Sequence, residues 1–371
     1  PEELPEREQE ILSWFDWPEM LDEPVGDGEI EALVARTTPW IEELAGVLTA
    51  DRVGQRLRGG VWSDEGVVDV PQWQEFTRLS QLHVARHLWR GEVVPAIDLA
   101  VLRWFVGLDY ARNGPLVQYL VGSAIVDISI EELRRILADH EVPPERLARL
   151  AGEIDVLIAS APRPIDAWRI EEIYLRDLFD QQLDFGDDAS PGAQVFFSEK
   201  ILFGDAVAQL APIRARFEEA METRPGREAV AATQAVEDDV RARWNPLLWV
   251  VVTVAPLYLE KAEDVAAKAA LLRATTAVAR FRAETGRVPD GLDALVPAYL
   301  DAVPDCPYGG APLRQEGLRV WSIGGDGVDG GGEAEMWDAP LSAEGDQVFT
   351  LVDRRPCIAL TGIDEELDAL L

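Results

Sequence analysis

Proline and glycine divide most of this chain into short apolar-periodic segments, and this punctuation constrains the fold more than any other feature. Within a segment, apolar residues recur every three or four positions, as at Trp73, Phe76, Leu79 and Leu82, which is the period of an amphipathic helix. Proline favours the first turn of a helix, and glycine favours its end. We therefore predict helices over residues 28–58, 71–90, 93–112, 115–140, 143–158, 164–183, 194–222 and 226–244.

These segments are expected to pack as antiparallel helices in a mainly α fold. Residues 78–112 have a tetratricopeptide-like character, with Gly91 and Glu92 at a bend and Ala96 where two helices would touch. The other segments lack the full repeat pattern. We predict an irregular helical bundle or solenoid, partly tetratricopeptide-like, that forms an α-helical domain over residues 1–245.

The chain changes character at residue 246. The apolar run over residues 246–259 contains a proline and is too short to span a bilayer, so we predict a buried helix there. A long amphipathic helix follows over residues 261–285 and stops at Gly286. Proline-rich loops and short apolar runs come next. We predict a small α+β domain over residues 246–354, with a long helix and a short antiparallel sheet, followed by a C-terminal tail to residue 371.

A glycine-rich loop lies inside this second domain, where residues 320–332 read VWSIGGDGVDGGG. An apolar run leads into six glycines and two aspartates, Asp326 and Asp329. Glycine permits close approach of the backbone, so such a loop can fold back with its carbonyl oxygens pointing inward. Carboxylates and carbonyls are the oxygen ligands that Ca²⁺ prefers. The loop therefore predicts a calcium site, and the alternative is a flexible acidic hairpin loop.

Three motifs follow the long helix in order, GRVPDGLDALVPAYL, PDCPYGGAPL and WSIGGDG. Together they resemble the soluble C-terminal part of the major pseudopilin of type II secretion systems, over roughly 100 of the 371 residues. In that family, the glycine-rich loop after the last motif binds calcium, and the ion orders the end of the domain. A pseudopilin joins its N-terminal helix directly to this domain, whereas some 245 residues precede it here. We therefore expect a borrowed module rather than a filament subunit.

The resemblance also implies a set of metal ligands. Asp326 matches the aspartate of the motif and is the first candidate, with the carbonyl group of Ile323 beside it. The later acidic ligand of the family has no clean match. Asp346 is preferred because an apolar strand follows it, and Asp338 is the alternative. Asp329 is either a ligand or a turn-forming residue, since Asp-Gly is a turn signal.

The net charge and the two cysteines indicate which binding partners and which cellular compartment to expect. The net charge of −34 repels nucleic acid phosphates and anionic lipid head groups, so we expect neither nucleic acid nor membrane-surface binding. The two cysteines, Cys306 and Cys357, form no zinc-binding pattern. A disulfide between them, which suits an extracytoplasmic compartment, is preferred over two free thiols.

Catalytic signatures are absent from the sequence. It contains no nucleophile elbow, no phosphate-binding loop and no dinucleotide-binding glycine motif. His83 and His87 share a helix face at the spacing of a metal pair, but no third ligand is identifiable, so structural histidines are preferred. We expect a protein that is not an enzyme.

The expected function is that of an extracytoplasmic scaffold or accessory protein, periplasmic or in the cell envelope, in a secretion-type or pilus-like assembly. It would bind protein partners through its helical region and reach the membrane only through an anchor that this chain does not contain. Two alternatives stay open. One is a hydrolase of glycan or peptidoglycan with a carboxylate pair hidden among the helices. The other is a helical ligand-binding protein with a pocket lined by Trp and Leu. The sequence does not define the oligomeric state.

Overall fold

The computed structural model of the protein describes residues 27–49, 70–112, 114–183, 193–222, 226–243, 245, 248–249, 255–308, 310–324, 327–332 and 345–351. The helices are α2 (Asp27–Thr49), α4 (Val70–Trp89), α5 (Val93–Ala111), α6 (Leu116–Asp139), α7 (Pro144–Ala159), α8 (Pro164–Leu183), α9 (Ala193–Glu222), α10 (Gly226–Arg241), α12 (Ala255–Thr285) and the 3-10 helix η3 (Leu292–Leu295). The strands are β1 (Arg314–Glu316), β2 (Arg319–Ser322) and β3 (Gln347–Thr350). The prediction of a mainly helical chain with a small antiparallel sheet is confirmed.

Proline and glycine mark helix boundaries as the sequence predicts. Pro115 is the N-cap residue of α6, and Pro144 is the first residue of α7. Gly91 follows α4 with a φ of 73°, and Gly286 follows α12 with a φ of 70°. Glycine reaches positive φ without the steric cost of a Cβ atom, so the chain can turn away from the helix axis at these points.

Two helices differ from their predicted bounds. The helix predicted over residues 28–58 is described only as far as Thr49, and residues 50–58 fall in a part of the chain that is not described. The long helix predicted from residue 261 begins earlier, at Ala255. Pro256 lies in its first turn, where the missing N–H group removes no hydrogen bond of the helix, so this proline is compatible with the helix start.

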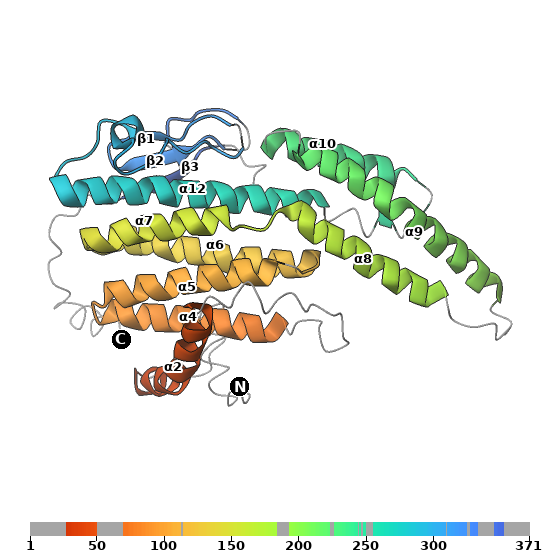
Figure 1. The fold of residues 1–371 in the computed structure, drawn as a ribbon, viewed down its shortest axis with the longest axis horizontal. Helices are drawn as coiled ribbons and strands as arrows, with labels where there is room; N and C mark the ends of the chain where they lie inside the picture. Colours follow the sequence, from red (N-terminus) through yellow and green to blue (C-terminus); the bar gives the residue numbers. More distant parts are fainter. Residues whose placement is uncertain are drawn as a thin grey trace, which may run out of the picture.

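The helices lie side by side in layers (Figure 1). α4, α5, α6 and α7 are stacked, and α12 packs on α6 and α7. The sheet covers the opposite side of α12, while α2 packs on α4 at the other end of the stack. α8 and α9 pack on one another and extend beyond the stack (Figure 1), with α10 between α9 and α12. This part of the chain therefore forms an elongated helical array.

The three strands pair in the order β1-β2-β3, and both pairings are antiparallel. Trp321 of β2 stands opposite Arg314 of β1 and Val348 of β3. Val320 and Phe349, which also face one another across the β2–β3 pair, are fully buried and belong to the core that contains α12. The connection from β2 to β3 contains the glycine-rich loop, so the sheet holds both ends of the predicted calcium site.

One hydrophobic core joins the helical region to the sheet. Its members come from α4, α5, α6, α7, α12, β2 and β3, among other segments, and include Trp104, Ile130, Leu150, Leu271 and Phe349. A second core joins α8, α9 and α10 to the ends of α5, α6 and α12. In it, the rings of Trp168 and Phe217 meet edge to face with centroids 5.0 Å apart. Residues from both sides of the predicted division at residue 246 share the first core. The division into domains at that point stays a prediction.

A buried polar network fastens α12 to α6 and to the sheet. Nζ of Lys268 lies 2.9 Å from Oδ1 of Asp127 on α6 and 3.2 Å from Oδ2 of Asp264 on α12. Oδ1 of Asp264 accepts hydrogen bonds from Nε2 of Gln347 at 2.8 Å and from the hydroxyl group of Tyr308 at 3.3 Å. Burial opposes the charge of the Lys268 ammonium group, but Asp127 and Asp264 outweigh that effect and raise its pKa.

A second buried charge connects α4, α5 and α6. Arg103 of α5 is completely buried, and its Nε and Nη1 atoms donate 3.1 Å hydrogen bonds to the hydroxyl groups of Ser129 and Ser80. Its Nη2 atom forms an ion pair with Glu132. A buried guanidinium group is stable only when its donors are matched in this way, so these partners determine how the three helices align.

Candidate functional site

The predicted calcium loop connects the end of β2, at Ser322, to the start of β3, at Gln347. Residues 323–324, 327–332 and 345–346 of this connection are described. Asp326 and Asp338, two of the predicted ligands, lie outside the described residues. The three other candidates, Ile323, Asp329 and Asp346, are among the described residues, and their contacts differ.

Asp346 has the environment that best fits a metal ligand. Its side chain is 1% exposed, and Oδ2 accepts a 2.8 Å hydrogen bond from the amide of Gly332. Oδ1 is also buried, and no donor among the described residues reaches it. A Cβ atom at Gly330 would lie 3.2 Å from Oδ2, so the glycine backbone passes close to this carboxylate. A buried oxygen without a partner is costly, and a cation would satisfy it.

Asp329 is engaged within the loop and with the sheet. Oδ1 accepts 3.1 Å hydrogen bonds from Nε1 of Trp321 and from the amide of Gly331, and Oδ2 forms an ion pair with Arg314. The hydrogen bond from Trp321, followed by that from Gly331, lowers the pKa of Asp329. These contacts suit a residue that shapes the turn, which is one of the two roles that the sequence suggests for it.

The carbonyl oxygen of Ile323 faces a cysteine. Sγ of Cys306 donates to this oxygen at 3.2 Å, and the hydroxyl group of Ser322 donates to Sγ at 2.7 Å. Cys306 is buried, while Cys357 falls in the undescribed end of the chain, so the predicted disulfide stays a prediction.

The described residues bring Asp346 and the glycine backbone together but do not complete a metal site. No group of three or more His, Cys, Asp or Glu side chains within this part of the chain is arranged to hold a metal ion. The loop nevertheless fits calcium at one point, because Asp346 presents a buried oxygen without a donor beside flexible glycine backbone. Asp346 and backbone carbonyl groups of the loop are the described atoms that would hold the ion.

His83 and His87 play separate structural roles. Nε2 of the buried His83 lies 2.8 Å from Oγ1 of Thr37, which joins α4 to α2. Nδ1 of His87 lies 2.6 Å from Oε2 of Glu92 at the start of α5. Burial, with smaller contributions from His87 and Arg86, lowers the pKa of His83 to about 4. The two rings therefore contact different residues, Thr37 and Glu92, which fits the interpretation of both as structural histidines.

A cavity of about 630 Å³ lies where α5, α6 and α12 meet the junction between α7 and α8. Its wall is mostly apolar and includes Trp104, Leu108, Val126, Leu157 and Leu259. Two features of the sequence create the space. α12 presents only alanine at positions 262, 266, 269 and 270, and Pro162 and Pro164 separate α7 from α8. Alanine leaves room that larger side chains would fill, and proline prevents one continuous helix.

Charged side chains surround this cavity. Nε of Arg273 lies 2.6 Å from Oδ1 of Asp155, and Nη1 of Arg163 lies 3.4 Å from Oε1 of Glu222. Glu263 of α12 also lines the cavity, and burial raises the pKa of its carboxyl group to about 7. Sequence reasoning missed Glu263 because it lies in a charged stretch of an amphipathic helix. Its position about one helical turn from the cavity-lining alanines of α12 is the only feature of the sequence that could have indicated its role.

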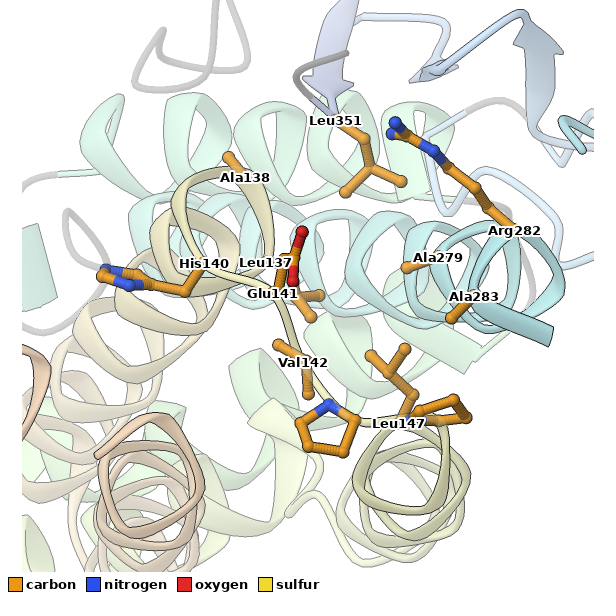
Figure 2. Close-up of a pocket in the computed structure, with 12 residues that line it drawn as sticks. Leu137, Ala138, His140, Glu141, Val142, Leu147, Ala279, Arg282, Ala283 and Leu351 are labelled. Carbon is orange, nitrogen blue, oxygen red and sulfur yellow. The ribbon is translucent and has the colours of Figure 1, made fainter. Parts of the chain in front are cut away.

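A second hollow of about 490 Å³ lies at the C-terminal end of α6 (Figure 2). Leu137 of α6, Leu147 of α7 and Ala279 of α12 line it, together with Leu351, which directly follows β3. Glu141 points between α6 and α12, whereas His140 points away from the hollow (Figure 2). The ionisable residues His140, Glu141 and Arg282 also belong to its lining.

Among the helices that the structure describes, none combines the length and the apolar composition needed to cross a membrane. No protein-family model matches the chain, and neither the curated proteins nor the solved structures contain a match. The likeness of the C-terminal region to pseudopilins therefore rests on the motifs of its sequence.

Proposed function

We propose that this chain is a non-enzymatic scaffold or accessory protein of a secretion-type or pilus-like assembly in the cell envelope. Its helical region, an irregular and partly tetratricopeptide-like array, binds protein partners. Its C-terminal region is a pseudopilin-like module that Ca²⁺ stiffens. The extracytoplasmic location belongs to the same proposal. The buried, half-satisfied carboxylate of Asp346 beside the glycine loop is the observation that carries it.

The elongated arrangement of the helices supports the scaffold part of the proposal. α8, α9 and α10 extend beyond the α5–α7 stack and pack on its end through a second core, so the array presents long helical surfaces rather than one compact face (Figure 1). Extended helical arrays commonly serve as binding surfaces for other proteins. The shared core and the Lys268 network connect the module rigidly to these helices. A partner bound to the helices would thus be held in a defined position relative to the module.

The environment of Asp346 supports the calcium part of the proposal. One oxygen is held by Gly332, which orients the carboxylate, while the other is buried and lacks a donor among the described residues. Asp326 is placed by sequence in the same loop and is the second ligand of the proposal. Ca²⁺ would offset the charge of both carboxylates and hold the β2–β3 connection against the sheet.

Thermal unfolding with Ca²⁺ and with EDTA tests this proposal. A ligand that binds only the folded state stabilises it by about 2.7 kcal/mol at a hundredfold excess over Kd, so Ca²⁺ should raise the Tm of the wild type. Asp346→Asn and Asp326→Asn should each abolish the rise. Asp301→Asn removes an exposed carboxylate of the same region and should retain it. Equal Tm values with Ca²⁺ and EDTA in the wild type would contradict the calcium module.

Partner binding needs a separate measurement. The wild-type chain should capture a defined protein from a solubilised envelope fraction, and a variant with charge reversals on exposed residues of α9 and α10 should lose it. Retention of the same protein by the variant would place the partner elsewhere. A failure to capture any protein above the level of an unrelated acidic control would contradict the scaffold function.

A further inference from the structure

The cavity between α5, α6, α12 and the α7–α8 junction has an apolar wall with one distinctive polar group. Ligand pockets generally have this composition, in which apolar side chains supply most of the contact area and a few polar groups orient the ligand. The volume of about 630 Å³ lies within the usual range for a small molecule. The charges on its wall therefore indicate what kind of molecule fits.

The two arginines of the wall are already neutralised. Arg273 forms an ion pair with Asp155 and also donates to the carbonyl oxygen of Tyr299 at 3.1 Å. Arg163 forms ion pairs with Asp166 at 2.9 Å and with Glu222 at 3.4 Å. Neither guanidinium group therefore offers an unmatched positive charge to an anionic ligand.

Glu263 is different, because no hydrogen bond or ion pair from the described residues reaches its carboxylate. The carboxylate lies near the start of α10, where a Cβ atom at Gly226 would be 2.7 Å from Oε2. It thus stands between the glycine backbone and the cavity, and no positive charge from the described residues is paired with it. Asp305, exposed on the loop that closes the cavity, adds a second negative charge to the same wall.

We propose that this cavity is a binding site for a small apolar molecule that carries one protonated amine, and that the carboxylate of Glu263 is the counter-ion of the ammonium group. The apolar part of the ligand lies against Trp104, Leu108 and Leu157, over the alanines of α12. This site is distinct from the calcium loop and goes beyond the scaffold function.

Two further properties support a cationic ligand. Burial raises the pKa of Glu263 to about 7, and an ammonium group beside the carboxylate would favour its ionised form. The net charge of −34 raises the concentration of cations near the whole chain, which favours their entry into any cleft of the surface.

Isothermal titration calorimetry with octylamine, octanol and octanoate tests the site, because these probes share one apolar chain and differ in charge. At about pH 8, where Glu263 is ionised, octylamine should bind the wild-type chain with a stoichiometry of one. Glu263→Gln should weaken octylamine at least tenfold and leave octanol unchanged. Octanoate should not bind. Equal affinity of octylamine for the wild type and for Glu263→Gln would overturn the proposal, as would octanoate binding as tightly as octylamine.

Two more variants test whether octylamine binds inside the cavity. Ala266→Phe fills the cavity from α12 without removing any charge and should abolish octylamine binding. Glu222→Gln removes a carboxylate from the same wall, but one that is paired with Arg163, and should change the octylamine affinity less than twofold. Unchanged binding in a folded Ala266→Phe variant would show that the amine binds elsewhere on the acidic surface, and the proposal would fall. A complete absence of heat with octylamine and the wild type would overturn it as well.

Discussion

Gly107 of α5 and Gly122 of α6 face one another where the two helices cross. A Cβ atom at Gly122 would lie 2.5 Å from the carbonyl oxygen of Gly107, and a Cβ atom at Gly107 would lie 2.8 Å from the carbonyl oxygen of Gly122. The two backbones therefore approach one another so closely that neither position leaves room for a Cβ atom. Trp104 of α5 and Val126 of α6, each within four residues of the crossing, belong to the common core.

Gly122→Ala should destabilise the protein by about 3 kcal/mol, because the added methyl group meets backbone that cannot move without separating α5 from α6. Urea unfolding followed by circular dichroism measures the change. Gly152→Ala is the matched control, since a Cβ atom there meets nothing within 4 Å in the interior of α7. That substitution should stabilise the chain by about 0.5–1 kcal/mol. Equal effects of the two substitutions would contradict the close crossing.

Asp127→Asn should cost about 3 kcal/mol, because it leaves Lys268 buried without its partner on α6. Urea unfolding measures the loss, and hydrogen exchange should show faster opening where α12 packs on α6. Glu316→Gln breaks an exposed ion pair with Arg319 and should have little effect. A loss no larger in Asp127→Asn than in this control would mean that the Lys268 network does not hold α12 in place.

His83 should make the contact between α2 and α4 sensitive to acid. Its pKa is lowered to about 4 in the folded chain, so the unfolded chain binds a proton first as the pH falls below about 6.5. The contribution of His83 to the free energy of unfolding is therefore present in full above about pH 6.5. It decreases toward pH 4, by up to about 3 kcal/mol in total. The stability difference between about pH 7.5 and about pH 4.5 should be smaller in His83→Gln than in the wild type.

His87→Gln is the control for this pH dependence, because His87 is paired with Glu92 at the surface rather than buried against Thr37. It should behave nearly as the wild type does. If His83→Gln shows the full loss of stability in acid, the protonation of another group is responsible and the role assigned to His83 is wrong.

Glu263 should have the opposite effect on stability. Its pKa is raised to about 7 in the folded chain from the model-compound value of 4.5, so the folded chain retains a proton that the unfolded chain releases. Stability should therefore fall by up to about 3 kcal/mol as the pH rises from about 5 to about 8. Glu263→Gln should remove this fall and be more stable than the wild type at about pH 8. An unchanged pH profile would contradict the unmatched charge at the cavity.

Part of the fold follows from local chemistry. Pro144 and Pro164 begin helices, and Gly91 and Gly286 end them, because each acts on its own φ angle whatever its neighbours are. The connection of the glycine loop to a strand on either side was likewise predictable from adjacent residues. The predicted turn-forming role of Asp329 fits its hydrogen bond to Gly331.

The two candidate sites could be predicted from the sequence only in part. Asp346 was selected because an apolar strand follows it, but its burial and its unsatisfied oxygen depend on Gly332, fourteen residues earlier in the chain. Glu263 resembled any other acidic residue of an amphipathic helix. Its unmatched charge appears only when Gly226 and the cavity wall are brought against it by other helices.

The sequence by itself determined most of the helix boundaries, although not the start of α12, and that a glycine loop joins two strands, because those features depend on residues within a few positions of one another. Only the tertiary structure decided which helices touch. The Gly107–Gly122 crossing, the pairing of Lys268 with Asp127 and the isolation of Glu263 each join residues from different helices. Burial and charge compensation are properties of such long-range contacts, and no local pattern of residues encodes them.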